Sequence, residues 1–269
     1  MTEISETFRE LKDRNEGALI AYLTVGDPHP ARTPKLVGAL IEGGADIVEL
    51  GVPFSDPIAD GPTIQNAVSR SLKSGMRPLD VFHVAQTINE KYDNPLVLMG
   101  YYNPIFRLGL AKFVELARRS GISGSIVPDL PVEESQEYKK ECLARGIDTI
   151  FLASPSTNHE RLKQILSQTS GYLYLVSLYG VTGMRAALPA SVLDLVATYG
   201  RLAGDTVPLA VGFGISRPDQ AGKIVRAGAD GVIVGSTFVK LIEQNQTNIN
   251  RAALKLKSLA HSMKKAVKI

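Results

Sequence analysis

The chain of 269 residues contains no tryptophan, one cysteine and few aromatic side chains. Scarce rings leave little for nucleic-acid bases to stack on, so we expect no nucleic-acid role. The lone Cys142 cannot form an internal disulfide bond, which fits a reducing, cytoplasmic location. No apolar run approaches the ~18 residues that a membrane span needs. The charged, amphipathic residues 1–14 do not resemble a signal peptide, so we expect a cytoplasmic protein without a membrane segment.

Metal ligands and covalent nucleophiles are also scarce. The four histidines lie far apart in the sequence, and no two have the spacing of a metal-ligand pair, so we expect no metal site. They are His29, His83, His159 and His261. No Ser-His-Asp arrangement is indicated, and no apolar run supplies a lysine for Schiff-base chemistry. Acid–base catalysis is the chemistry that this composition leaves open.

Eight short apolar runs alternate with longer amphipathic stretches. The runs cover residues 18–24, 46–51, 96–101, 124–127, 149–152, 172–177, 208–213 and 231–235. Strict alternation of strand and helix over eight units predicts an α/β fold that closes into a (β/α)8 TIM barrel. An open, doubly wound sheet is the alternative, but no dinucleotide-type first turn is present. Residues 1–14 and 248–268 add an N-terminal and a C-terminal helix, and residues 1–269 are expected to form one domain.

A carboxylate, Glu49, lies inside the second apolar run. Because side chains alternate along a strand, Val48 and Leu50 should face the helices while Ile47 and Glu49 point into the barrel. A buried ion pair is the structural alternative, but none of the eight runs contains lysine or arginine. Burial without a cation raises the pKa of a carboxyl group, which suits a general acid–base catalyst near neutral pH. Hydroxyl groups near the strand ends come from Tyr22, Thr24, Tyr101, Tyr174 and Ser177.

Two further acids, Asp56 and Asp60, lie on the loop that follows this strand. Asp56 is flanked by prolines and could be a turn residue. Asp60 could be the N-cap of a helix, but Thr63 is expected to serve as that cap, which leaves Asp60 free. Spacing alone does not decide which of the two aspartates takes part in chemistry.

Three glycine-rich loops follow the last three predicted strands, at residues 180–183, 212–216 and 235–236. Glycine lets backbone N–H groups approach an anion, and a helix N-terminus adds favourable partial charge. One such loop would indicate only a tight turn. Three of them, at the strand ends where barrel enzymes often hold phosphate, predict a phosphorylated small-molecule substrate.

The chain resembles the tryptophan synthase alpha subunit family along its whole length. The residues at 49–57 and 59–62, ELGVPFSDP and ADGP, carry the most specific match, and segments 23–28, 99–104, 128–131 and 212–215 also match. The resemblance implies retro-aldol cleavage of indole-3-glycerol phosphate to indole and glyceraldehyde 3-phosphate, a lyase reaction of tryptophan biosynthesis. Protonation at C3 makes the indole ring its own electron sink, so the reaction requires neither a lysine nor a metal.

The resemblance also implies roles for single residues. Glu49 would be the general acid–base catalyst. Asp60 would accept a hydrogen bond from the indole N–H and stabilise positive charge there. Tyr22, Met99 and Leu152 are expected to line the indole pocket, and Tyr174 matches a family residue near the substrate.

The phosphate-binding loops would include Gly183, Gly212, Phe213, Gly214, Gly235 and Ser236. Thr182 matches a mobile loop that closes the site and excludes water. Three residues near it, Leu178, Tyr179 and Met184, depart from the family pattern. The departures leave the expected chemistry unchanged and put only the kinetics of loop closure in question.

A partner is implied in the same way: a tryptophan synthase beta subunit that carries pyridoxal phosphate, in an α2β2 heterotetramer through which indole is channelled. This chain would itself hold no cofactor. Apolar loops beside the active site fit a partner surface, although packing among the loops is an equal alternative from the residues alone. The apolar residues are Pro53, Phe54, Pro104, Ile105, Phe106, Leu130 and Pro131. Polar contacts with the partner, through which substrate binding would influence that subunit, would come from Asp56, Asn103 and Asp129.

Two other functions stay open at this stage. The chain could be a free-standing lyase that releases indole, or a non-catalytic barrel that binds phosphates and regulates a partner. The presence of both Glu49 and Asp60 argues against the second. A direct assay for indole release separates the catalytic hypotheses from the regulatory one.

Overall fold

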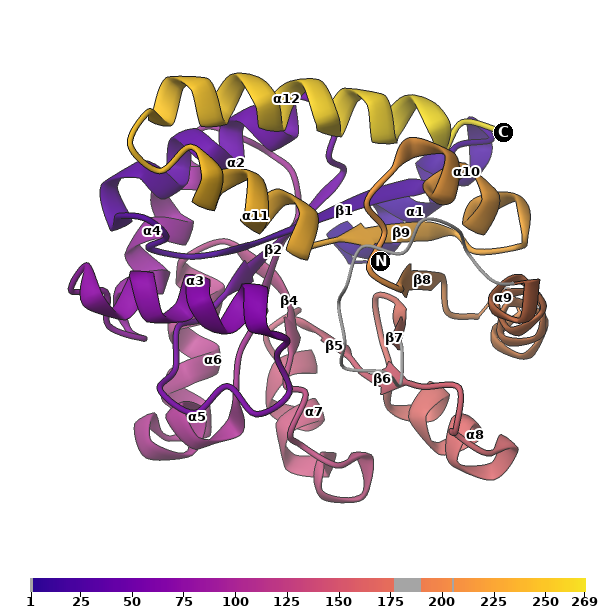
Figure 1. The fold of residues 1–269 in the computed structure, drawn as a ribbon. Helices are drawn as coiled ribbons and strands as arrows, with labels where there is room; N and C mark the ends of the chain where they lie inside the picture. Colours follow the sequence, from indigo (N-terminus) through magenta and orange to yellow (C-terminus); the bar gives the residue numbers. More distant parts are fainter. Residues whose placement is uncertain (1, 177–189, 205) are drawn as a thin grey trace.

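The computed structural model describes residues 2–176, 190–204 and 206–269, in which parallel strands form a barrel (Figure 1). The strands follow the order β5-β4-β3-β2-β1-β9-β8-β7-β6. Their bounds are β1 Ala18–Thr24, β2 Ile47–Gly51, β3 Leu96–Met99, β4 Ile122–Ile126, β5 Asp148–Ile150, β6 Leu152–Ala153, β7 Leu173–Val176, β8 Leu209–Gly212 and β9 Gly231–Val234. Only Phe151 separates β5 from β6, so the chain itself joins the two ends of the sheet. The predicted TIM barrel is confirmed.

Helices surround the barrel, and the long C-terminal α12 lies across α2 and α10 (Figure 1). The helices are α1 Glu3–Asp13, α2 Thr33–Glu42, α3 Pro62–Lys73, α4 Asp80–Asn89, α5 Tyr102–Leu108, α6 Leu110–Arg119, α7 Gln136–Leu143, α8 His159–Gln168, α9 Ala190–Ala203, α10 Pro218–Arg226, α11 Ser236–Gln244 and α12 Ile249–Ala266. Two short 3-10 helices, η1 Pro30–Arg32 and η2 Val132–Glu134, precede α2 and α7. The predicted terminal helices correspond to α1 and α12.

Alternating side chains divide each strand between an inner and an outer core. In β2, Ile47 belongs to the inner cluster, whereas Val48 and Leu50 belong to the outer cluster beneath the helices. The inner cluster also includes Ile4 and Phe8 of α1, so this helix fills the amino-terminal end of the barrel. The opposite end of this inner core, at the carboxyl ends of the strands, is where barrel enzymes place their sites.

Two local differences from the predicted elements have physical reasons. The fifth predicted strand, residues 149–152, is divided, because β5 pairs with β4 while β6 pairs with β7. The segment around Phe106, expected to be a loop, forms helix α5 instead. Pro104 lies in the first turn of α5, where its missing N–H removes no helical hydrogen bond. The carboxylate of Asp129 also accepts a hydrogen bond from the N–H of Tyr102 at 2.9 Å.

Candidate active site

Glu49 is fully buried inside the barrel and is held by a tyrosine. Its Oε1 accepts a hydrogen bond from the hydroxyl of Tyr172, with 2.6 Å between the two oxygens. Its Oε2 has no hydrogen-bond partner within the described part of the chain. In the sheet register, Glu49 lies between Tyr22 of β1 and Val97 of β3. The predicted inward orientation is confirmed, with one carboxylate oxygen held by a tyrosine of the inner cluster.

Burial raises the pKa of Glu49 to about 7, and the hydrogen bond from Tyr172 opposes part of that rise. A carboxyl group with this pKa is present in both protonation states near neutral pH, as proton transfer requires. Tyr172 is not one of the hydroxyl groups predicted at the strand ends. It lies two residues before Tyr174 and hence on the same strand face, so the alternation rule could have identified it.

Asp60 is fixed by a second tyrosine and by the helix that follows it. Its Oδ2 accepts a hydrogen bond from the Tyr101 hydroxyl at 2.8 Å, and the amide of Gln65 donates to its backbone carbonyl at 2.9 Å. Burial raises the pKa of Asp60, while the bond from Tyr101 lowers it. The predicted capping role of Thr63 is wrong, because Gly61 is the N-cap of α3 and Thr63 lies inside the helix. Glycine leaves that first turn open, so Asp60 is still available.

Tyr22 and Tyr174 lie beside the two carboxylates. Burial raises the pKa of both hydroxyls, and the negative charges of Asp60 and Glu49 raise it further. A Cβ on Gly51 would lie 2.2 Å from the Tyr22 hydroxyl oxygen, and a Cβ on Gly212 would lie 2.6 Å from the Tyr174 ring. Glycine at these two positions therefore makes room for the rings.

Two of the predicted indole-pocket residues, Met99 and Leu152, are partly buried and pack against the inner cluster. Met99 also packs against the cluster that contains Tyr22. Both side chains lie at the end of the barrel that also holds the carboxylates of Glu49 and Asp60. The structure thus brings together the acidic and apolar residues that the sequence places on β1, β2, β3, β6 and β7.

The loops after β8 and β9 have the backbone features of an anion site. Gly214 has a φ of +67°, and a Cβ there would meet no atom within 4 Å. Gly235 is the N-cap of α11 and Ser236 its first residue, and the N-cap glycine has no side chain to bond the first N–H groups of this helix. Helix N-terminal N–H groups without a cap can bind an anion. Phe213 is partly buried against the outer core. The predicted residues Thr182 and Gly183, with Leu178, Tyr179 and Met184, lie outside the described residues.

The loops predicted to contact a partner divide into buried and exposed parts. Pro53, Ile105 and Leu130 are buried. Packing within the chain therefore accounts for these three apolar residues, and contact with a partner is not needed to explain them. Phe106 is 72% exposed, and Ile58 on the Asp60 loop is 81% exposed. The remaining predicted contacts are partly or fully exposed: Phe54, Asp56, Asn103, Pro104, Asp129 and Pro131.

The two described cavities lie away from Glu49. The larger, about 530 Å³, lies between β3 and helices α4, α5 and α6, behind Tyr101. The smaller, about 340 Å³, includes Leu152 and Asp129 in its wall. Within residues 2–176, 190–204 and 206–269, no group of three or more His, Cys, Asp or Glu residues could hold a metal ion. No helix in the same ranges is long and apolar enough to cross a membrane.

Comparisons with known proteins agree with this geometry. A family model described as tryptophan synthase alpha chain matches residues 8–268. The tryptophan synthase alpha chain of Methanosarcina mazei is 50% identical over 97% of this chain and 93% of its own length. Among solved structures, the alpha chain from Legionella pneumophila has a TM-score of 0.90 at 34% identity, covering 99% of this chain and 97% of that one. A structure of the Pyrococcus furiosus tryptophan synthase a2b2 complex has a TM-score of 0.86 at 42% identity, covering 93% and 98%. The chain therefore belongs to the tryptophan synthase alpha chain family.

Proposed function

We propose that this chain cleaves indole-3-glycerol phosphate to indole and glyceraldehyde 3-phosphate by acid–base catalysis. The observation that carries the proposal is Glu49, a fully buried carboxyl group with a pKa of about 7. It is oriented through Oε1, and its Oε2 has no hydrogen-bond partner among the residues that the structure describes. Membership of the alpha chain family supports the same reaction.

Glu49 would begin the reaction protonated and transfer its proton to C3 of the indole ring. The ring then carries positive charge on its nitrogen and can accept the electron pair of the C–C bond. As that bond breaks, the adjacent side-chain hydroxyl becomes the aldehyde oxygen and returns its proton to Glu49. The carboxyl group ends in its starting state, and a pKa near 7 makes both transfers accessible.

Asp60 would stabilise the positive charge that builds on the ring nitrogen. Its carboxylate is already oriented by Tyr101 and by the start of α3, so little reorganisation is needed when charge develops. Tyr22, Tyr174, Met99 and Leu152 would enclose the ring. The loops at Gly214 and Gly235 would hold the phosphate, on backbone N–H groups at the N-terminus of α11.

We further propose a beta subunit as the partner, in an α2β2 complex, with pyridoxal phosphate bound by that subunit and no cofactor bound by this chain. The a2b2 complex of the Pyrococcus furiosus relative supports this assembly. The exposed side chains of Phe106 and Ile58 lie on elements that also carry or contact the site, where a partner could both bind and influence it.

A direct assay for indole release tests the proposal. Glu49→Gln should abolish turnover while binding of glycerol 3-phosphate stays within about threefold, because the amide cannot transfer the proton. Asp148→Asn is a matched control, because Asp148 is also a buried carboxylate whose Oδ2 lacks a hydrogen-bond partner among the described residues. Asp148 is the first residue of β5 and so lies at the opposite end of the barrel from the proposed site. It should keep near wild-type turnover.

Three outcomes would change the assignment. Wild-type-like turnover of Glu49→Gln would remove Glu49 from the mechanism. High activity of the isolated chain, unaffected by a beta subunit, would favour a free-standing lyase. No indole release with or without a beta subunit would favour the non-catalytic, phosphate-binding barrel.

A further inference from the structure

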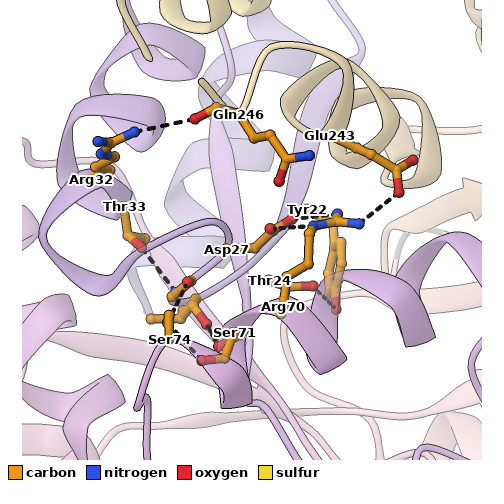
Figure 2. Close-up of polar contacts among 12 residues, drawn as sticks. Tyr22, Thr24, Asp27, Arg32, Thr33, Arg70, Ser71, Ser74, Glu243 and Gln246 are labelled. Atoms are coloured by element: carbon orange, nitrogen blue, oxygen red, sulfur yellow. Dashed lines mark hydrogen bonds and ion pairs between the residues drawn. The ribbon is translucent and has the colours of Figure 1, made fainter. Parts of the chain in front are cut away.

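A partly buried arginine joins three segments at the carboxyl end of the barrel (Figure 2). Arg70 of α3 donates to both carboxylate oxygens of Asp27, from Nε at 2.8 Å and from Nη2 at 2.9 Å. Its Nη1 donates to Oε1 of Glu243 in α11 at 2.6 Å. Asp27 is 1% exposed and lies in the loop after β1. One guanidinium group therefore connects the β1–α2 loop, α3 and α11.

Further hydrogen bonds strengthen the connection between α3 and the β1–α2 loop (Figure 2). Ser71 donates to the carbonyl of Val25 at 2.6 Å, and Ser74 donates to the carbonyl of Gly26 at 3.2 Å. The same loop segment is fixed from α2, where the Thr33 hydroxyl accepts the N–H of Gly26 at 3.0 Å. Helix α3 is thus held at its last turn and at its C-cap residue Ser74.

The amino-terminal end of α3 carries Asp60. Gln65 in its first turns donates to the Asp60 carbonyl at 2.9 Å, and the backbone N–H groups of Ile64 and Gln65 donate to Gly61. A tilt or shift of α3 would therefore move Asp60 relative to the substrate ring. The geometry of Asp60 depends on what holds the other end of this helix.

Helix α11 begins at the proposed phosphate loop and carries Glu243 near its end. Val239 of α11 packs with Ile64 and Val68 of α3 and with Tyr22 in one apolar cluster. These contacts are apolar and non-directional, whereas the Arg70 bonds to Asp27 and Glu243 fix direction as well as distance.

We propose that Arg70 is a positioning residue that sets the separation between Asp60 and the phosphate-binding end of α11. The inference rests on the proposed lyase function. A substrate held by its phosphate at one end and by Asp60 at the other requires a fixed spacing between the two contacts, and Arg70 of α3 bonds directly to Glu243 of α11. Lysine would keep the charge at this position. Its single nitrogen cannot reproduce the bidentate contact with Asp27 together with the hydrogen bond to Glu243.

The proposal is tested with Arg70→Lys and Glu243→Gln in the full chain, assayed with a beta subunit. For Arg70→Lys we expect kcat to fall about tenfold, because small displacements of a catalytic group are costly. Glycerol 3-phosphate, which engages only the phosphate end, should bind within about threefold of wild type. Glu243→Gln, which leaves the Asp27 contacts intact, should show the same pattern with a fall of about threefold.

A double-mutant cycle distinguishes positioning from general damage. If Arg70 acts through Asp60, the effect of Arg70→Lys on kcat should largely disappear in an Asp60→Asn background. Arg119→Lys is the matched control, because Arg119 forms an exposed ion pair with Glu115 on α6 and should leave kcat unchanged. Thermal unfolding of each variant verifies the fold, and Glu243→Gln alone decides the question if Arg70→Lys does not fold.

Two results would overturn the inference while leaving the lyase function intact. One is a kcat within twofold of wild type in the folded Arg70 and Glu243 variants. The other is an undiminished effect of Arg70→Lys in the Asp60→Asn background. Failure of the wild-type chain to release indole would instead overturn the proposed function, and this inference with it.

Discussion

Tyr172 contacts Glu49 from a segment 123 residues further along the chain and bonds to only one of its two carboxylate oxygens. The hydroxyl can donate to the ionised carboxylate and stabilises that form, which lowers the pKa of Glu49 against the larger effect of burial. The tyrosine therefore both orients the carboxyl group and adjusts the pH at which it loses its proton.

Tyr172→Phe should raise the pKa of Glu49 further, because burial then acts without the opposing hydrogen bond. We expect the ionisation attributed to Glu49 in the pH profile of kcat/KM to move to higher pH, and kcat to fall about tenfold. Tyr138→Phe is the control, since Tyr138 is a buried tyrosine of the outer cluster. A pH profile that does not move in Tyr172→Phe would show that Tyr172 does not act on Glu49.

Glu49→Gln should also change how stability depends on pH. The folded protein keeps the Glu49 proton up to a pKa of about 7, whereas the unfolded chain loses it near 4.5. The wild-type free energy of unfolding should therefore decline across that window, by about 3 kcal/mol from this group. Urea denaturation at pH 4 and pH 8 measures the free energy of unfolding of the variant and the wild type. Relative to the wild type, the variant should be more stable at pH 8 than at pH 4. Equal pH dependence of the two proteins would mean that Glu49 ionises normally when folded.

Asp60→Asn should lower kcat by about 100-fold or more, because the amide cannot stabilise a positive charge on the ring nitrogen. Asp56→Asn offers a comparison on the same loop: Asp56 is exposed and accepts a hydrogen bond from Ser55 at 2.5 Å. Steady-state kinetics of the isolated chain should show little effect of the Asp56 change. A loss of less than tenfold in Asp60→Asn would assign Asp60 a structural role.

Phe106→Asp should weaken binding of the beta subunit at least tenfold, about 1.4 kcal/mol, since it places a charge on an exposed apolar position of α5. Titration calorimetry with the beta subunit measures the effect, and indole release by the isolated chain should stay unchanged. Leu254→Asp is the control, because Leu254 is 70% exposed on α12. Unchanged binding of the beta subunit by Phe106→Asp would place the interface elsewhere, and equal weakening by both changes would show that the effect is not specific to α5.

Local patterns accounted for much of the fold and for one half of the site. Alternation along the run 46–51 correctly placed Glu49 inside the barrel, because successive side chains of a strand point to opposite faces and Val48 and Leu50 pack under the helices. Alternation of strand and helix predicted the closed barrel. The fifth strand and helix α5 were less predictable, because pairing with different neighbours divides the first and a hydrogen bond from Tyr102 to Asp129 supports the second.

The partners of the acidic residues were not predictable from spacing. Tyr172 meets Glu49, Tyr101 meets Asp60, and Arg70 meets Asp27 and Glu243 through contacts between segments 41 to 173 residues apart. The N-cap of α3 was also assigned wrongly to Thr63, since the backbone at Gly61 already has the extended geometry that begins the helix.

By itself, the sequence determined the strand–helix order, the inward direction of Glu49 and the glycine-rich turns, because each depends on residues that are neighbours along the chain. Tertiary structure alone decided which hydroxyl meets which carboxylate, and whether an apolar loop residue such as Leu130 is buried or exposed. Those outcomes depend on closing the barrel, which brings distant strands into contact and removes water from around Glu49. Its raised pKa results from that burial and so could be inferred from the strand pattern only as an expectation.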